Sequence, residues 1–164
     1  MKFRPLILTA LACLSFGTAQ AADPMEGSGL PVPRFASLKS GNAYVRTGPS
    51  MDYPIKWIYK REGLPVEITK EYDSWRKIRD QEGETGWVHK LLLSGQRSAL
   101  IKSKEIVTAY NDENMKRAIA QLEPGAIVDI EECTRLVCHA KFLTYEGWID
   151  KKNLWGVYDS EIFN

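Results

Sequence analysis

The chain has 164 residues, of which 26% are charged and 44% hydrophobic, an ordinary balance for a globular protein. Its 22 lysines and arginines stand against 21 aspartates and glutamates, giving a formal net charge of +1. This balance excludes the concentrated basic field of a nucleic-acid-binding protein and indicates no charged partner of either sign.

The first 21 residues have the pattern of a secretory signal peptide. Lys2 and Arg4 supply positive charge, and LILTALACLSF is an apolar run too short for a permanent bilayer-spanning helix. AQA, residues 19–21, is a small-x-small cleavage site. We therefore expect cleavage after Ala21 and no transmembrane anchor in the mature protein; a retained membrane anchor is the alternative.

Removal of 21 of the 164 residues leaves 143, enough for one domain or two very small ones. Cleavage also takes away two basic residues and no acidic ones, so the mature net charge becomes −1. Residues 22–34, ADPMEGSGLPVPR, are rich in glycine, proline and small polar residues, which predicts a flexible linker. Within it, LPVPR could act as a stiff spacer or occupy a groove as a polyproline II segment.

The most informative feature that follows is an internal repeat. At an offset of 62, Val45, Gly63, Val66 and Ile68 fall on Val107, Gly125, Val128 and Ile130. After one deletion the offset becomes 61, and GWVHKLLLSG (86–95) is answered by GWIDKKNLWG (147–156). An ordered set of matches with a single gap is hard to obtain by chance, so the sequence predicts two copies of one unit.

Each copy shows short strand patterns separated by turn residues. In the first copy we expect strands at AYVR (43–46), IKWIY (55–59), PVEITK (65–70), SWRKIR (74–79) and TGWVH (85–89). KLLL (90–93) is too short for an ordinary helix and predicts a single 3₁₀ turn. In the second copy, ENMKRAIAQL (113–122) has a helical composition, but the repeat aligns it with a strand region, so we predict a strand there.

A unit of about sixty residues with five or six short strands has the size of a small closed or nearly closed β-barrel, in which closure removes exposed sheet edges. We expect Trp75, Trp87 and Trp148 to supply much of the small cores, because aromatic side chains bury large areas.

Cys133 and Cys138 remain after cleavage, and an even number of cysteines in an exported protein favours a disulfide. The four intervening residues, TRLV, allow a tight hairpin turn that brings the two together. A metal site is the alternative, but two thiols with His139 beside them fall short of a four-ligand zinc set.

VRTGPSMDYP (45–54), KREGLPVEI (60–68) and GWVHKLLL (86–93) resemble the pattern of bacterial SH3 (SH3b) domains, with its loop, strand pair and terminal GWV in this order. The pair of copies is similar to exported tandem-SH3 proteins of Gram-negative bacteria. The second copy departs at TAYNDENMK (108–116) and has Val137 where Trp75 stands in the first. The resemblance implies an all-β fold of two tandem SH3-like small β-barrels, a periplasmic location and binding of peptidoglycan or its peptides. The expected layout is signal peptide 1–21, linker 22–34, first SH3-like domain 35–95, second, divergent domain 97–158 and tail 159–164.

The sequence carries no recognisable catalytic constellation. HExxH, GxSxG and glycine-rich phosphate loops are absent from it, and His89 and His139 lie in different copies. The two copies consume nearly all of the expected mature chain, which leaves no room for a separate catalytic domain. We therefore expect a non-enzymatic protein with no cofactor and no metal; a small hydrolase that uses His89 is the alternative.

A binding surface is the remaining possibility, since SH3-like barrels bind ligands on aromatic patches beside their long loops. The candidates are Arg46, Asp52, Tyr53, Trp57, Tyr59 and Tyr72. Trp57 and Tyr59 share one face of a strand, which could be core or exposed site. Asp52 and Tyr53 lie in a proline-bounded loop, the usual place for binding residues. The expected function is cell-envelope binding through the first copy; a periplasmic protein–protein adaptor is the alternative.

Overall fold

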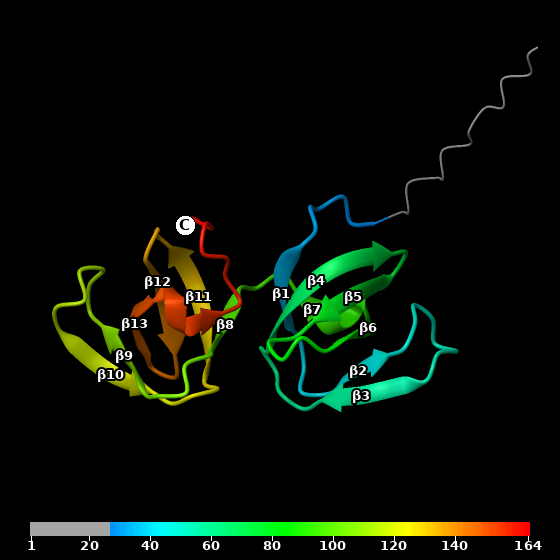
Figure 1. Ribbon diagram of the computed structural model, residues 1–164, viewed down its shortest axis with the longest axis horizontal. Coiled ribbons are helices and arrows are strands. Elements are labelled where there is room, and N and C mark those ends of the chain that lie inside the picture. Colours follow the sequence, from blue (N-terminus) through cyan, green and yellow to red (C-terminus); the bar gives the residue numbers. More distant parts are fainter. Residues whose placement is uncertain (1–26) are drawn as a thin grey trace, which may run out of the picture.

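The computed structural model describes residues 27–164, which form two antiparallel sheets of seven strands each (Figure 1). This confirms the predicted all-β class. No helix among the described residues is long and apolar enough to cross a membrane. The predicted signal peptide, its cleavage site at Ala21 and the first residues of the predicted linker lie outside the described residues.

The first unit contains strands β1–β7 and one 3₁₀ turn. Its elements are β1 (Arg34–Leu38), β2 (Ala43–Arg46), β3 (Ile55–Tyr59), β4 (Pro65–Tyr72), β5 (Trp75–Arg79), β6 (Thr85–His89), η1 (Lys90–Leu92) and β7 (Leu93–Ser94). The second unit follows directly and contains β8–β14. Its elements are β8 (Ser98–Ile101), β9 (Val107–Tyr110), β10 (Ala118–Leu122), β11 (Ile127–Cys133), β12 (Val137–Phe142), β13 (Tyr145–Asp150), η2 (Lys151–Asn153) and β14 (Leu154–Trp155).

The two sheets have the same topology. The strand order is β3-β2-β6-β5-β4-β1-β7 in the first unit and β10-β9-β13-β12-β11-β8-β14 in the second, each number raised by seven. The repeat read from the sequence is therefore a repeat of structure. It also explains why residues 118–122 form a strand despite a helical composition: β10 takes the place of β3 and pairs with β9.

Two glycines show why the repeat preserves particular residue types. Gly63 and Gly125 precede β4 and β11 and have positive φ angles of 72° and 76°, a region that favours glycine. Their amides donate to the carbonyl oxygens of Leu38 and Ile101, each at 2.8 Å. The same tight turn therefore leads into the long central hairpin of each unit and is hydrogen-bonded to the end of its first strand.

Each sheet is an open ladder rather than a closed one. In the described part of the chain β3 is not paired with β7, and β10 is not paired with β14. The terminal strands of each ladder are a five-residue strand and a two-residue strand. We predicted a small closed or nearly closed barrel for each copy; each copy is a seven-stranded antiparallel sheet, and closure into a barrel is not found.

The cores are built from aliphatic side chains rather than from tryptophans. Val88 and Ile149 are fully buried, whereas Trp87 and Trp148, which precede them on β6 and β13, are only partly buried. The expectation that these two tryptophans fill the cores was wrong; Trp75 alone of the three is buried. The reason is strand alternation, because Gly86 must face inward: a Cβ there would lie 2.3 Å from a methyl carbon of Val45.

The predicted disulfide is confirmed. Cys133 and Cys138 are bonded directly across the β11–β12 hairpin. At the same place in the first unit, Glu71 and Arg76 face each other across the β4–β5 hairpin and form an ion pair of 2.9 Å. Their side chains are only 9% and 6% exposed. The two units therefore tie the same hairpin by different chemistry.

In each unit, the first residue of this cross-strand pair also binds a segment outside the sheet. The Glu71 carboxylate accepts hydrogen bonds from the Ser28 amide, the Ser28 hydroxyl and Arg34. In the second unit, the backbone of Cys133 exchanges two hydrogen bonds with Phe163, of 2.7 and 3.1 Å. Residue 71 and its counterpart 133 thus each anchor a terminal segment to a sheet.

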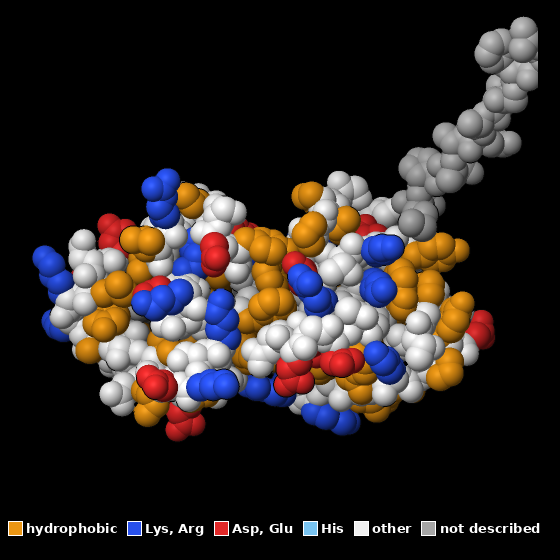
Figure 2. Space-filling view, viewed as in Figure 1, with side chains coloured by type: hydrophobic (Ala, Val, Ile, Leu, Met, Phe, Trp, Pro, Cys, Tyr) orange, Lys and Arg blue, Asp and Glu red, His pale blue; other side chains and the backbone are white. Residues whose placement is uncertain are grey.

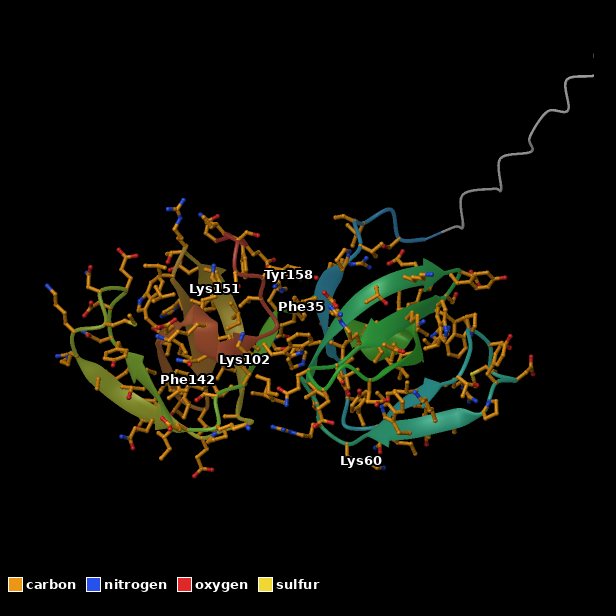
Figure 3. The ribbon with its side chains drawn as sticks, viewed as in Figure 1. Phe35, Lys60, Lys102, Phe142, Lys151 and Tyr158 are labelled. Carbon is orange, nitrogen blue, oxygen red and sulfur yellow. A yellow bond between two sulfur atoms is a disulfide. The ribbon has the colours of Figure 1, made fainter. Side chains whose placement is uncertain are left out.

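Hydrophobic side chains gather where the two units meet (Figure 2), and Phe35 lies beside Tyr158 there (Figure 3). The Phe35 ring lies 5.2 Å from the Trp155 ring and 4.7 Å from the Tyr158 ring, measured between centroids. The Tyr158 hydroxyl donates to the buried Glu67 carboxylate at 2.9 Å. The Ser98 hydroxyl donates to the Gly63 carbonyl at 2.6 Å. Aromatic packing and buried hydrogen bonds therefore join one sheet to the other.

Loss of the disulfide is expected to destabilise the second unit. The bond joins cysteines five residues apart, so its contribution should be near the low end of the usual range, about 2 kcal/mol. Urea unfolding of the oxidised protein and of a Cys133→Ala/Cys138→Ala variant measures the difference. Reductant should change the stability of the parent protein and not that of the variant; equal midpoints for the two proteins would contradict this role.

The lowered pKa of Glu71 predicts that the folded protein loses stability in acid. Burial alone would raise its pKa, but hydrogen bonds from Ser28 and Arg34 outweigh burial and lower the pKa to about 2. A lowered folded-state pKa stabilises the fold above the ordinary value of 4.5, and this contribution disappears as the pH falls toward 2. Its upper limit is about 3 kcal/mol.

We expect Glu71→Gln to lower the free energy of unfolding at pH 7 and to have little effect near pH 2. Urea unfolding across this pH range measures the difference between variant and parent. Glu123→Gln, at an exposed position, is the control. A Glu71→Gln effect that stays constant from pH 7 to pH 2 would show that the lowered pKa does not contribute.

Candidate functional site

The β2–β3 loop, residues 47–54, is held by hydrogen bonds within itself. The Thr47 amide donates to the Pro54 carbonyl at 3.0 Å and closes the loop at its base. The Ser50 hydroxyl donates to the Asp52 carboxylate at 2.8 Å, and the Asp52 amide donates back to that hydroxyl at 3.1 Å. The predicted rigid loop is therefore present, with Asp52 exposed near its tip.

Tyr53 is presented on this loop by two neighbours. Its ring lies on Gly48 so closely that a Cβ at residue 48 would lie 2.6 Å from three ring atoms. The Arg46 guanidinium donates to the Tyr53 carbonyl at 2.7 Å. Tyr53 nevertheless remains 46% exposed. Gly48 and Arg46 therefore fix the orientation of an aromatic ring that solvent can still reach.

Trp87 belongs beside this loop, although we predicted it to be in the core. It is the cross-strand partner of Arg46 between β6 and β2, and cross-strand partners lie on one face of a sheet. The Gly86–Val88 alternation could have revealed its outward position. We call Arg46, Asp52, Tyr53 and Trp87 the loop surface: two aromatic rings, a cation and a carboxylate.

Trp57 and Tyr59 occupy a different place. Both are partly buried and pack against the core of the first unit, with their rings edge to face at 5.9 Å. The Tyr59 hydroxyl donates to Asp80 at 2.6 Å, and burial together with this hydrogen bond raises the pKa of Tyr59 well above its ordinary value. The Trp57 indole nitrogen is buried and has no hydrogen-bond partner among the described residues. The main role of these two rings is to pack β3 against the core of the first unit.

Tyr72 lies apart from the other candidates, at the end of β4 where the chain turns into β5. It is exposed, and its cross-strand partner is Trp75. The six candidate residues therefore divide into three groups. Arg46, Asp52 and Tyr53 lie on or beside the loop, Trp57 and Tyr59 pack on the core edge, and Tyr72 stands on another hairpin.

The loop surface is not repeated in the second unit. Tyr110 takes the place of Arg46, since it is the cross-strand partner of Trp148 as Arg46 is of Trp87. The second loop, closed by the Asn111 amide on the Arg117 carbonyl, contains no aromatic residue. The loop there is shaped by Asp112, whose carboxylate accepts from the Asn114 amide at 2.9 Å. The fold is thus built in the second unit without the residues that present Tyr53 in the first.

Both histidines have structural contacts. His89 caps the 3₁₀ turn η1 by accepting from the Leu91 amide at 3.3 Å, as Asp150 caps η2 in the second unit. His139 lies 3.1 Å from Glu131 on the neighbouring strand. With Glu146 these two residues form a group of described side chains able to hold a metal ion. The Lys141 ammonium already pairs with Glu131, so a metal ion would have to displace it.

One family model matches part of this chain. Residues 39–95 match the family model of the bacterial SH3 domain, which spans the loop surface and most of the first unit. No match is found among curated proteins.

Two solved structures share a distant similarity. NlpC2 from Trichomonas vaginalis is 14% identical, with a TM-score of 0.34 over 76% of this chain and 48% of that chain. NlpC1 from the same organism is 12% identical, with a TM-score of 0.35 over 77% of this chain and 47% of that chain. The chain spans about half the length of either protein.

Tyr59 is expected to matter for stability. Tyr59→Phe removes the hydroxyl that donates to Asp80, and a net loss of about 1 kcal/mol in the free energy of unfolding should follow. Tyr72→Phe, at an exposed tyrosine, should change stability by less than about 0.5 kcal/mol. Urea unfolding at pH 7 compares the two variants. Equal effects would show that the Tyr59–Asp80 contact does not contribute.

Proposed function

We propose that this protein is a non-enzymatic binding module of the cell envelope, exported to the periplasm, which recognises peptidoglycan or its peptides through the loop surface of the first unit. The observation that supports the proposal is the β2–β3 loop, whose internal hydrogen bonds and contact with Gly48 hold Tyr53 in an exposed position. This loop lies within the residues that match the bacterial SH3 domain. Domains of this family commonly bind the cell wall.

The chemistry of the loop surface suits a ligand of sugar and peptide groups. The exposed Tyr53 ring and the partly buried Trp87 ring can pack against sugar rings or peptide planes. The Arg46 guanidinium uses one of its nitrogens for the Tyr53 carbonyl, and its remaining N–H groups can bind a ligand carboxylate. The Asp52 carboxylate can accept from an amine.

The second unit has a supporting role in this proposal. It shares the strand order of the first unit, and we infer that it is a divergent SH3-like domain. Since it has Tyr110 in the place of Arg46 and no aromatic residue in its β9–β10 loop, it does not carry an equivalent surface. The first unit is therefore the proposed site of recognition, and the second unit buttresses it through the Phe35 junction.

A sedimentation assay with purified peptidoglycan at physiological salt tests this function. The parent protein should be retained, and Tyr53→Ala should reduce the apparent affinity at least tenfold, because the ring makes most of the exposed aromatic area of the loop. Arg46→Met should have a smaller effect in the same direction. Tyr72→Ala is the matched control, since this tyrosine is equally exposed but lies on another hairpin.

Two results would oppose the proposal. Absence of retention for the parent protein would exclude cell-wall binding, and recovery of a single crosslinked envelope protein would then favour the adaptor function. Retention that is equally strong for Tyr53→Ala and the parent protein would exclude the loop surface as the site.

A further inference from the structure

The junction of the two units contains two equivalent contacts. In each unit, the first strand pairs with the last: Ser37 pairs with Ser94 between β1 and β7, and Leu100 pairs with Trp155 between β8 and β14. Each pair faces the other unit. Ser37 pairs across its sheet with Pro65, just as Leu100 pairs with Ile127. The junction therefore has two halves that correspond residue by residue, as in an interface between identical subunits.

One half of the junction is filled. Leu100 and Trp155 of the second unit lie against a groove of the first unit formed by Tyr59, Leu64 and Pro65. The cavity that remains there is about 180 Å³. Beside it, the Tyr158 hydroxyl donates to Glu67 on β4. The groove in this half thus accommodates large apolar side chains, and a hydrogen-bond donor beside them binds the Glu67 carboxylate.

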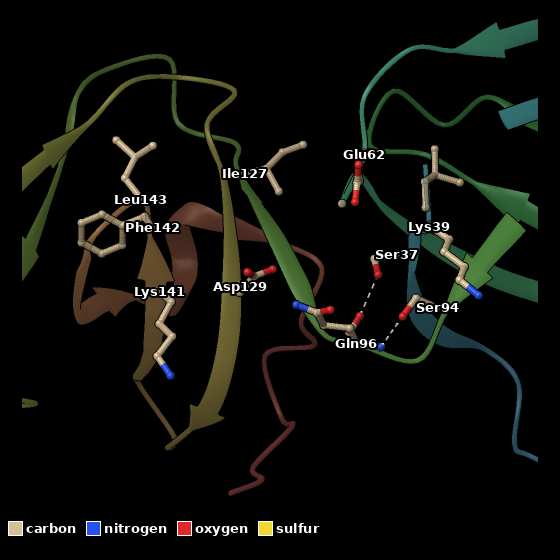
Figure 4. Close-up of a pocket in the computed structure, with 12 residues that line it drawn as sticks. Ser37, Lys39, Glu62, Ser94, Gln96, Ile127, Asp129, Lys141, Phe142 and Leu143 are labelled. Carbon is tan, nitrogen blue, oxygen red and sulfur yellow. Dashed lines mark hydrogen bonds between the residues drawn. The ribbon is translucent and has the colours of Figure 1, made fainter. Parts of the chain in front are cut away.

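The other half is open. Ser37 and Ser94 of the first unit stand where the filled half has Leu100 and Trp155, and they face Ile127, Phe142 and Leu143 of the second unit (Figure 4). The cleft has a volume of about 520 Å³, within the usual range for ligand sites. Two serines in place of a leucine and a tryptophan account for much of the difference between the two halves.

The open half also contains a carboxylate, that of Asp129, which receives no hydrogen bond from a side chain of residues 27–164. Asp129 on β11 corresponds to Glu67 on β4, as Lys141 corresponds to Arg79 across the hairpin. Glu67 is buried, pairs with Arg79 and receives the Tyr158 hydroxyl. Lys141 instead pairs with Glu131, so Asp129 is exposed and forms no ion pair or side-chain hydrogen bond within residues 27–164. Glu62 lines the opposite wall of the cleft (Figure 4).

We propose that this cleft binds a short peptide. The peptide supplies an apolar side chain and a hydrogen-bond donor, the groups that Trp155 and Tyr158 supply in the filled half. An apolar or aromatic side chain of the peptide packs on Ile127 and Phe142, where Trp155 packs in the filled half. A free ammonium group of the peptide binds Asp129, where Tyr158 binds Glu67 in the filled half. This site is separate from the loop surface and does not rest on the proposed function.

Binding of the tripeptide Gly-Trp-Gly to the purified protein, measured by calorimetry or by amide chemical shifts, tests the proposal. We expect saturable binding, and at least tenfold weaker binding of the N-acetylated tripeptide, which lacks the ammonium group. Ser94→Trp copies the residue that fills the other half and should weaken binding at least tenfold. Ser94→Ala keeps the cleft open and should bind as the parent protein does. Tyr72→Ala, at an exposed tyrosine outside both surfaces, should also leave the affinity unchanged.

Asp129→Lys provides a second test, because residue 129 is exposed and a charge reversal there leaves the core intact. It should weaken the binding of Gly-Trp-Gly at least tenfold, so the proposal remains testable if Ser94→Trp fails to fold. Absence of saturable binding by the parent protein would overturn the proposal. It would equally be overturned if a folded Ser94→Trp variant, or Asp129→Lys, bound the tripeptide as tightly as the parent protein does.

Discussion

The contact of Phe35 with Trp155 and Tyr158 is the constraint on which the arrangement of the whole chain depends. A single small sheet buries a limited core, and these rings extend the buried region from one unit into the other. Tyr158 also donates a hydrogen bond to the buried Glu67. The contact therefore favours one relative orientation of the two units, in addition to burying apolar surface. Two small units are thereby joined by aromatic packing and by hydrogen bonds.

Duplication explains both the regularity and the asymmetry of this protein. Positions that shape the backbone are the same in both copies: Gly63 and Gly125 at the turn, and Gly86 and Gly147 where two strands pass closely. Positions that face outward have diverged, so that only the first copy has the Tyr53 loop and only the second has Trp155. Divergence at the surface of a repeated fold is where separate roles for the two copies can arise.

Much of the fold could be predicted from the sequence because local patterns determine it. Alternation located most strands, the repeat corrected the helical composition of β10, and the cysteine spacing indicated the disulfide. Trp87 was misplaced because its position depends on Gly86, whose need to face inward arises only from the approach of β2. The junction could not be predicted, since Phe35 and Trp155 lie 120 positions apart and no local pattern links them. For the same reason the candidate site was predicted only in part: the loop is local, whereas its neighbour Trp87 comes from a distant strand.

The exchange of an ion pair for a disulfide at equivalent hairpins means that the two halves of the molecule have different weak points. The Glu71–Arg76 pair depends on ionisation, and the Cys133–Cys138 bond depends on oxidation. Acid therefore weakens the contact that holds residues 28–34 to the first sheet, whereas reduction weakens the hairpin that holds Phe163 to the second.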